Sequence, residues 1–218
     1  MVRINRKEMA ALQSPDVQNV EQGRANRRKG EHFEEQIERG FDAYWRAGLA
    51  MMAKMPVPTR QVGRKSAGPP QIVRCGASPF DFYGMSLLDA RFIAMEAKAS
   101  GPKPSLRIVL PMLKGNKVVE GQGNGLKLHQ IESLAQVAEN GGIARVVWNN
   151  GGEVMALTER SIINACDDAM TAWKIKQAGG LPEQGTCSIR FEQFIYCDAG
   201  SYGDIEIETD WLGTQTPR

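Results

Sequence analysis

Asp81, Glu96 and Lys98 have side chains and a spacing that could support chemistry on a charged substrate. Side chains alternate between the two faces of a β-strand, so Glu96 and Lys98 would project together. If the preceding segment pairs alongside, Asp81 joins them. Two carboxylates and a lysine suit phosphodiester hydrolysis, because carboxylates hold Mg²⁺ while the lysine orients water or stabilises charge on the phosphate. The structural alternative is a surface ion pair on an edge strand.

Two further groups of side chains could join this site from helices. Glu34 lies in a predicted first helix, and His129-Gln130 opens a predicted helix downstream. Each has a structural interpretation as well: acids in a first turn complement the helix dipole, and His129 and Gln130 suit a helix cap or a surface. The order and spacing of these residues favour one common site.

Hydrophobic periodicity predicts the elements that would position these residues. Apolar residues recur three and four apart over 31–50, which predicts a helix. Apolar and aromatic runs at 79–84 and 90–97 predict two paired strands that carry Asp81 and Glu96. Other predicted elements are strands at 71–74, 106–110 and 204–208, helices at 129–139 and 158–177, and a hairpin of 143–148 with 154–157. Beyond 208 the chain is expected to fray. This order predicts a single α/β or α+β domain with a central mixed sheet flanked by helices.

Basic residues concentrate in the first third of the chain. Residues 1–75 hold 14 Lys and Arg against 8 Asp and Glu, whereas the remainder holds 13 against 17. This asymmetry favours a polyanionic partner such as nucleic acid, although a solvated charged tail would look similar. We expect residues 1–29 to form a flexible basic arm and 56–79, rich in proline and glycine, to form a basic loop. The candidate phosphate contacts are Arg27, Arg28, Lys29, Arg60, Arg64, Lys65 and Arg74.

Composition excludes several classes of protein. Hydrophobic residues make up 42% and charged residues 24% of 218, which is ordinary for a globular domain. The apolar stretches are too short to span a bilayer, and no secretory signal is visible. The four cysteines and two histidines do not have zinc-site spacing. We therefore expect a reduced, cytoplasmic protein that does not contact a membrane.

Five segments together resemble the RecU-type Holliday junction resolvases of the PD-(D/E)XK nuclease superfamily. Those segments are Gly30–Ile37, Pro56–Thr59, Ala77–Gly84, Phe92–Lys98 and Leu128–Glu132, with looser support from Gly142–Leu157. The resemblance covers residues 26–195. It implies an α/β fold with a restriction-endonuclease-like core, a nuclease domain over 30–200 and a C-terminal tail over 201–218. Residues 56–79 would correspond to the projecting stalk that enters the junction.

The resemblance also implies a role for each candidate residue. Asp81 and Glu96, helped by the Ala97 carbonyl, would bind Mg²⁺, with Mn²⁺ as a possible substitute. Lys98 would be the catalytic lysine, and Gln130 would position metal-bound water or the phosphate. Glu34 would be an auxiliary acid from the first helix. Members of the family act as homodimers on branched, four-way DNA and can work with recombination proteins.

The chain departs from the family pattern in two places. The segment that corresponds to the stalk is shorter, and the segment between Lys98 and His129 is longer. Both differences affect how a junction would be engaged more than they affect the metal site. Two other functions therefore stay open: a related nuclease acting on flaps or linear DNA, and a non-catalytic DNA-binding module with the same fold.

Overall fold

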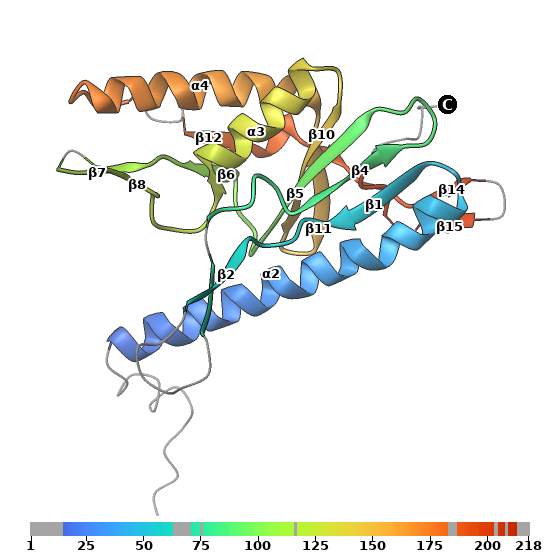
Figure 1. Cartoon of the computed structure of the whole chain (residues 1–218), viewed down its shortest axis with the longest axis horizontal. Coiled ribbons are helices and arrows are strands. Elements are labelled where there is room, and N and C mark those ends of the chain that lie inside the picture. The colour runs from blue at the N-terminus through green and yellow to red at the C-terminus, as the bar shows by residue number, and fades with distance from the viewer. Residues whose placement is uncertain are drawn as a thin grey trace, which may run out of the picture.

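A six-stranded mixed sheet forms the centre of the protein, as seen in a computed structural model (Figure 1). The structure describes residues 15–62, 71–74, 76–115, 117–182, 187–202, 205–207 and 209–212. Helix α2 (Pro15–Arg46) packs on one face of the sheet, and helices α3 (Leu128–Glu139) and α4 (Glu159–Gln177) pack on the other. The prediction of a mixed sheet flanked by helices is confirmed, and the class is α/β.

The strand order in the main sheet is β1-β4-β5-β10-β11-β13. These strands are β1 (Ala50–Lys54), β4 (Phe82–Ser86), β5 (Phe92–Ser100), β10 (Ile143–Asn150), β11 (Glu153–Leu157) and β13 (Ile195–Tyr196). The pair β5–β10 is parallel and the other pairs are antiparallel. Strand β5 therefore lies between β4 and β10, with helices over both of its faces. This position explains why it is an almost continuous apolar run.

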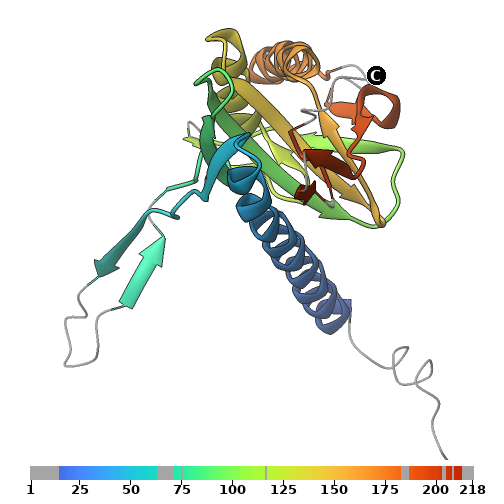
Figure 2. The same cartoon turned by 90° about the vertical axis from the view of Figure 1, so that its right-hand side faces the viewer.

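The first helix is much longer than the sequence predicts. Its apolar stripe, which includes Phe33, Ile37 and Tyr44, is buried against the sheet, but from Val20 to His32 no described side chain is buried. The helix predicted over 31–50 in fact begins at Pro15 and ends at Arg46. Residues 15–29 therefore belong to a helix rather than to a loose arm, while 1–14 lie outside the described residues. The amphipathic signal is missing there because this half of α2 has no surface to pack on, and it projects from the body (Figure 2).

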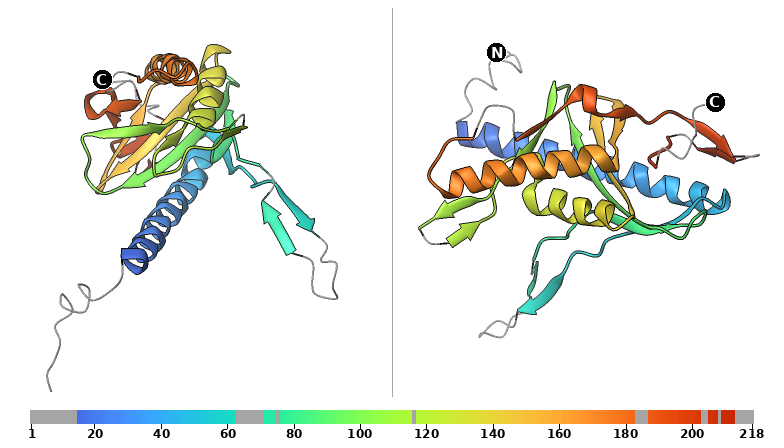
Figure 3. Two further views of the ribbon diagram at one scale, coloured as in Figure 1. Left: turned by 90° about the vertical axis from the view of Figure 1, so that its left-hand side faces the viewer. Right: turned by 90° about the horizontal axis from the view of Figure 1, so that it is seen from above.

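The predicted basic loop contains a second projection. Strand β2 (Thr59–Val62) pairs antiparallel with β3 (Gln71–Arg74), and the resulting hairpin extends away from the sheet (Figures 2 and 3). The sequence predicts only the strand at 71–74. Its partner was missed because Thr59–Val62 follows a proline-rich stretch that favours a loop. The hairpin and the free half of α2 leave the body on the same side and diverge from each other (Figure 2).

The segment between β5 and α3 folds into smaller sheets beside the main one, and a later strand, β12, completes one of them. Strands β12 (Ser188–Arg190), β6 (Ser105–Val109) and β9 (Leu126–Lys127) form a three-stranded sheet, and β7 (Met112–Lys114) pairs with β8 (Lys117–Val119). The predicted strand at 106–110 is thus confirmed as β6. A short 3-10 turn, Phe191–Gln193, precedes β13.

The second half of the chain agrees well with the predicted elements. The predicted helices correspond to α3 and α4, and the predicted hairpin corresponds to β10–β11. Gly141, which has a φ of 80°, follows α3 as the left-handed residue that often ends a helix. The predicted strand at 204–208 pairs as β15 (Ile205–Ile207) with β14 (Gly200–Tyr202). The expected fraying beyond 208 is wrong for residues 209–212, because Asp210, Trp211 and Leu212 are buried, and residues 213–218 lie outside the described part of the chain.

Candidate active site

Asp81 is held by both of its neighbouring strands where the chain enters β4. Its N–H donates to the Met95 carbonyl at 3.1 Å, and its carbonyl accepts from the Met55 N–H at 2.7 Å. The carboxylate oxygen Oδ2 accepts a hydrogen bond from the Ala97 N–H at 2.9 Å. The Asp81 side chain thus satisfies a backbone donor of β5 on the side of β4. It lies beside Glu96 and Lys98, so the conditional prediction that Asp81 joins them is confirmed.

Glu96 and Lys98 interact directly, as their shared strand face predicts. The Lys98 ammonium donates to Glu96 Oε1, and the same oxygen accepts from Gln130 Nε2. Glu96 is fully buried, and its second oxygen, Oε2, has no hydrogen-bond partner among the described residues. A buried carboxylate oxygen without a partner is costly in a folded protein, and it marks a position where a cation or donor would be stabilising.

The surroundings change the acidity of both groups. Burial raises the pKa of Glu96 from 4.5 to about 8, and the Asp81 carboxylate adds to that rise while Lys98 opposes it. Burial by itself would lower the pKa of Lys98, but Glu96, Asp81 and Glu34 together raise it above its usual value. Lys98 therefore keeps its positive charge at physiological pH, and the site combines one permanent cation with two closely coupled acids.

Gln130 has two roles at the beginning of α3. Its Oε1 accepts a hydrogen bond from the Lys127 N–H at 2.9 Å, which satisfies a backbone donor at the helix start, while its Nε2 donates to Glu96. Gln130 therefore fixes the orientation of Glu96 relative to the helix. His129, its neighbour in the predicted motif, lies half-buried in the first turn of α3.

Glu34 approaches the site from the opposite face of the sheet. Its Oε2 forms an ion pair with Lys54 Nζ at 3.1 Å, and Lys54 also pairs with Glu38 at 2.7 Å. Glu34 still helps to raise the pKa of Lys98, so it influences the site by charge rather than by direct contact with the other acids. Lys54 was missed by the sequence analysis, and only its place opposite Phe82 in the β1–β4 register reveals that it neighbours Asp81.

The donor set fits a divalent metal ion with hard oxygen ligands. Asp81 and Glu96 supply carboxylates, and in an extended strand the N–H and C=O of one residue point to the same side. Because the Ala97 N–H points to Asp81, the Ala97 carbonyl also faces that side. The partnerless Glu96 Oε2 is a third available oxygen. Among the described residues, no group of three or more His, Cys, Asp or Glu side chains could hold a metal, so such an ion would need backbone, water or phosphate ligands.

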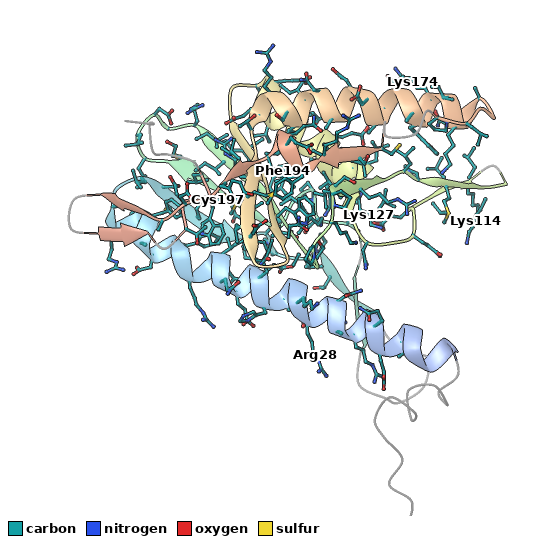
Figure 4. All side chains as sticks on the ribbon, turned by 180° about the vertical axis from the view of Figure 1, so that it is seen from behind. Arg28, Lys114, Lys127, Lys174, Phe194 and Cys197 are labelled. Carbon is teal, nitrogen blue, oxygen red and sulfur yellow. The ribbon has the colours of Figure 1, made fainter. Side chains whose placement is uncertain are left out.

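The predicted phosphate contacts that the structure describes fall on the two projections. Arg28 and Lys29 are exposed on the free half of α2, and Arg27 pairs with Glu31 at 2.8 Å on the same half. Figure 4 shows Arg28 on α2 and Lys174 on α4, on opposite sides of the molecule. In the hairpin register, Arg60 lies opposite Val73 and Arg74 lies opposite Thr59. Arg64 and Lys65 lie outside the described residues.

Most aromatic side chains near the site are too buried to stack on bases of a nucleic acid. Trp148 and Phe82 are fully inaccessible to solvent and Trp173 nearly so. Both tryptophans therefore belong to the core. Tyr83 is half-buried and packs against the core on the α3 side.

A comparison of the chain with known protein families finds no match, and a comparison with curated proteins finds none either. Within the described part of the chain, no helix is both long and apolar enough to cross a membrane. A function has to be argued from the fold and from the geometry of the site.

Proposed function

We propose that the protein is a Mg²⁺-dependent, structure-selective DNA endonuclease that resolves four-way junctions. The observation that carries this proposal is the cluster of Asp81, Glu96, Lys98 and the Ala97 backbone at one edge of β5. A buried, partnerless carboxylate oxygen beside a charged lysine is poorly explained as a surface ion pair. In this proposal the sheet and its helices form a restriction-endonuclease-like core.

Each residue of the cluster has a distinct task. Asp81, Glu96 and the Ala97 carbonyl would hold Mg²⁺, which when bound lowers the pKa of water and neutralises phosphate charge. Lys98 remains protonated and donates hydrogen bonds to the phosphate or to the attacking water, which stabilises charge that develops during cleavage. Gln130 keeps Glu96 oriented toward this task, and Glu34 supports the charge on Lys98.

The two projections supply a reason for selecting branched DNA. The β2–β3 hairpin and the free half of α2 diverge from one side of the body, and both carry basic residues (Figure 2). Basic side chains bind the phosphate backbone without regard to sequence. Two diverging basic elements suit DNA whose arms also diverge, which a linear duplex does not offer.

Cleavage of a labelled four-way junction tests the proposal. The junction, a flap and a matched linear duplex are each incubated with Mg²⁺, Mn²⁺ or EDTA. We expect metal-dependent, symmetric cuts on the junction, and a loss of about 10² to 10⁴ in rate for Asp81→Asn and Lys98→Ala with junction binding retained. Lys174→Ala, an exposed lysine on α4, is the control and should cut normally.

The other outcomes separate the alternative functions. Equal metal-dependent cutting of junction, flap and duplex would keep the nuclease site but remove junction selectivity. Tight junction binding without cutting in either metal would indicate a DNA-binding module. Normal cutting by both purified active-site variants would refute the site.

A further inference from the structure

The segment between β5 and α3 is basic, although the chain after residue 75 is acidic as a whole. Against a single acid, Glu120, it holds five basic residues: Lys103, Arg107, Lys114, Lys117 and Lys127. Charge of one sign that gathers in one segment favours an anionic partner there. None of these five side chains is a ligand in the proposed metal site, so their charge needs a separate explanation.

Two of these lysines face each other at the end of the β7–β8 hairpin. Lys114 lies directly opposite Lys117 in the strand register, and both are exposed. Like charges in opposed positions destabilise a pair of strands. Neither lysine forms an ion pair with another residue in the described part of the chain, so this repulsion is not offset there. A polyanion bound at the hairpin would offset it.

The neighbouring pair in the hairpin is apolar and is exposed as well. Leu113 lies opposite Val118, and their exposed fractions are 46% and 58%. Side chains alternate between the faces of a strand, so the apolar pair is on one face of the hairpin and the lysine pair is on the other. A partner that covers both pairs has to enclose the hairpin and to offer both negative charge and apolar surface.

The base of the hairpin is held on both sides. Before β7, the Pro111 carbonyl accepts a hydrogen bond at 3.0 Å from Nζ of Lys176 on α4. After β8, Gly121 lies so close to the outgoing chain that a Cβ would come within 2.0 Å of the Leu110 carbonyl oxygen. A projection that is fixed at its base loses less conformational entropy when it binds a partner.

Lys127 connects the base of the hairpin to the candidate active site. Its Nζ donates to the carbonyls of Gly121 at 2.7 Å and Gly123 at 3.1 Å. Its N–H donates to Gln130, which in turn donates to Glu96. The hairpin also extends from the same end of the molecule as the free half of α2 (Figures 1 and 3). DNA held by α2 at this end would therefore meet the hairpin too.

We propose that the β7–β8 hairpin binds one arm of the DNA substrate by entering its major groove, which is wide enough for a two-stranded ribbon. Lys114 and Lys117 would contact phosphates at the edge of the groove, while Leu113 and Val118 would pack on base edges such as the thymine methyl group. A groove encloses both faces of a ribbon, whereas a flat protein surface covers only one. This inference deepens the proposed function and rests on it for the choice of DNA as the polyanion.

Binding of a labelled four-way junction in EDTA tests the lysine contacts without cleavage. The double variant Lys114→Glu with Lys117→Glu keeps like charges opposite each other, so the pairing within the hairpin is no less favourable than before. Its dissociation constant should rise about 10-fold or more, and the slope of log K against log salt concentration should fall by about 2. Arg160→Glu with Lys174→Glu, both exposed on α4, changes the net charge equally and should bind nearly like the wild type.

The apolar pair and the groove are tested in the same assay. Leu113→Ser with Val118→Ser removes no charge, so it should weaken binding several-fold and leave the salt slope unchanged. A glucosyl group on 5-hydroxymethylcytosine projects into the major groove, where the thymine methyl group also lies. Junctions that carry it should bind the wild type more weakly, and this loss should be smaller in the two hairpin variants. Circular dichroism should be unchanged, because all substituted positions are exposed.

Several outcomes would overturn the proposal. They are unchanged binding in both hairpin variants, a loss in the lysine variant no larger than in the α4 variant, and an equal effect of the glucosyl group on wild type and hairpin variants. A wild-type chain that never cuts, but whose junction binding depends on the hairpin, would refute the nuclease function and leave this inference standing. Normal metal-dependent cutting with binding that does not depend on the hairpin would do the reverse.

Discussion

The fully buried Glu96 determines the chemistry of the candidate site more than any other residue. It shares one oxygen between Lys98 and Gln130 and leaves the other without a partner. A glutamate that only formed an ion pair with a lysine at the surface would keep water on both carboxylate oxygens. Such a pair would not require the glutamate to be buried. When Glu96 is ionised, its desolvated carboxylate and the nearby Asp81 carboxylate repel each other, and a divalent cation between them would relieve that repulsion.

The raised pKa of Glu96 predicts how the free energy of unfolding of the metal-free protein depends on pH. Folded Glu96 has a pKa of about 8 instead of 4.5, so it keeps a proton that the unfolded chain releases. The stability that this provides is fully present below about pH 4.5 and is lost as the pH rises toward 8. The Glu96→Gln variant does not titrate, so its stability relative to wild type should increase over this interval by a few kcal/mol, at about 1.4 kcal/mol for each pKa unit.

Urea unfolding in EDTA at pH 5 and at pH 8.5 measures this difference. Glu153→Gln, an exposed acid on β11, is the control and should show the same difference from wild type at both pH values. A pH-independent difference for Glu96→Gln as well would mean that Glu96 titrates normally in the folded chain.

At the scale of elements, the start of α3 links helix formation to the geometry of the site. Gln130 caps the helix through Oε1 and holds Glu96 through Nε2, so two variants can separate these roles. Gln130→Ala removes both contacts and should cost about 1 kcal/mol of stability as well as most of the cleavage rate. Gln130→Glu keeps the capping acceptor but sets a carboxylate oxygen against Glu96 Oε1 where Nε2 donates, so it should retain the helix cap and still lose stability through repulsion at Glu96.

The pH profile of cleavage shows whether Gln130 positions Glu96 or only stabilises the start of α3. With Gln130→Glu, the added negative charge should move the acidic limb of the profile to higher pH. An unchanged profile with only a lower rate would contradict the contact with Glu96.

The free half of α2 makes a prediction about binding. Arg28 and Lys29 are exposed there and have no ion-pair partner among the described residues. The double variant Arg28→Glu with Lys29→Glu should weaken junction binding and reduce the slope of log K against log salt concentration by about 2, one for each lost phosphate contact. Fluorescence anisotropy at several salt concentrations measures the slope. Lys174→Glu on α4 lowers the net charge by about half as much as the double variant without touching this helix, so about half the effect there would show that only net charge matters.

Elements marked by apolar periodicity or by turn residues could be predicted from the sequence, and elements without such a pattern could not. The pair β4–β5 was predicted from apolar runs and a short connection, although β4 begins at Phe82, just after Asp81, and β5 continues to Ser100. The hairpin β10–β11 followed from Asn-Gly between two apolar runs. In contrast, the N-terminal half of α2 has no apolar stripe, so only its helix-forming composition could have indicated it. The role of Lys54 depends on a strand register, which residue types alone do not specify.

At the scale of the whole molecule, the C-terminal segment closes the core from the far end of the sequence. Trp211 packs edge-to-face on Phe33 with ring centroids 5.9 Å apart, and it approaches α2 so closely that a Cβ at Gly40 would lie 2.9 Å from its Nε1. The Tyr44 hydroxyl donates to Asp210 at 3.0 Å and accepts from the Leu212 N–H at 3.3 Å. The sequence could not predict this docking, because a short polar tail has no periodicity and its partners lie at the other end of the chain.

The packing of this C-terminal segment on α2 predicts that Trp211, in the region expected to be a tail, is essential to stability. Trp211 is 6% exposed, so Trp211→Ala should leave a cavity against α2 and cost about 3–5 kcal/mol. Trp45→Ala, near the C-terminal end of α2 and 55% exposed, is a control that removes the same side chain and should cost less than about 1 kcal/mol. Urea denaturation of the two variants gives both values, and equal losses would show that the tail does not anchor α2. Because α2 carries both Glu34 and the exposed basic residues, Trp211→Ala should also weaken junction binding near its melting temperature while leaving the contacts of Asp81 and Glu96 unchanged at low temperature.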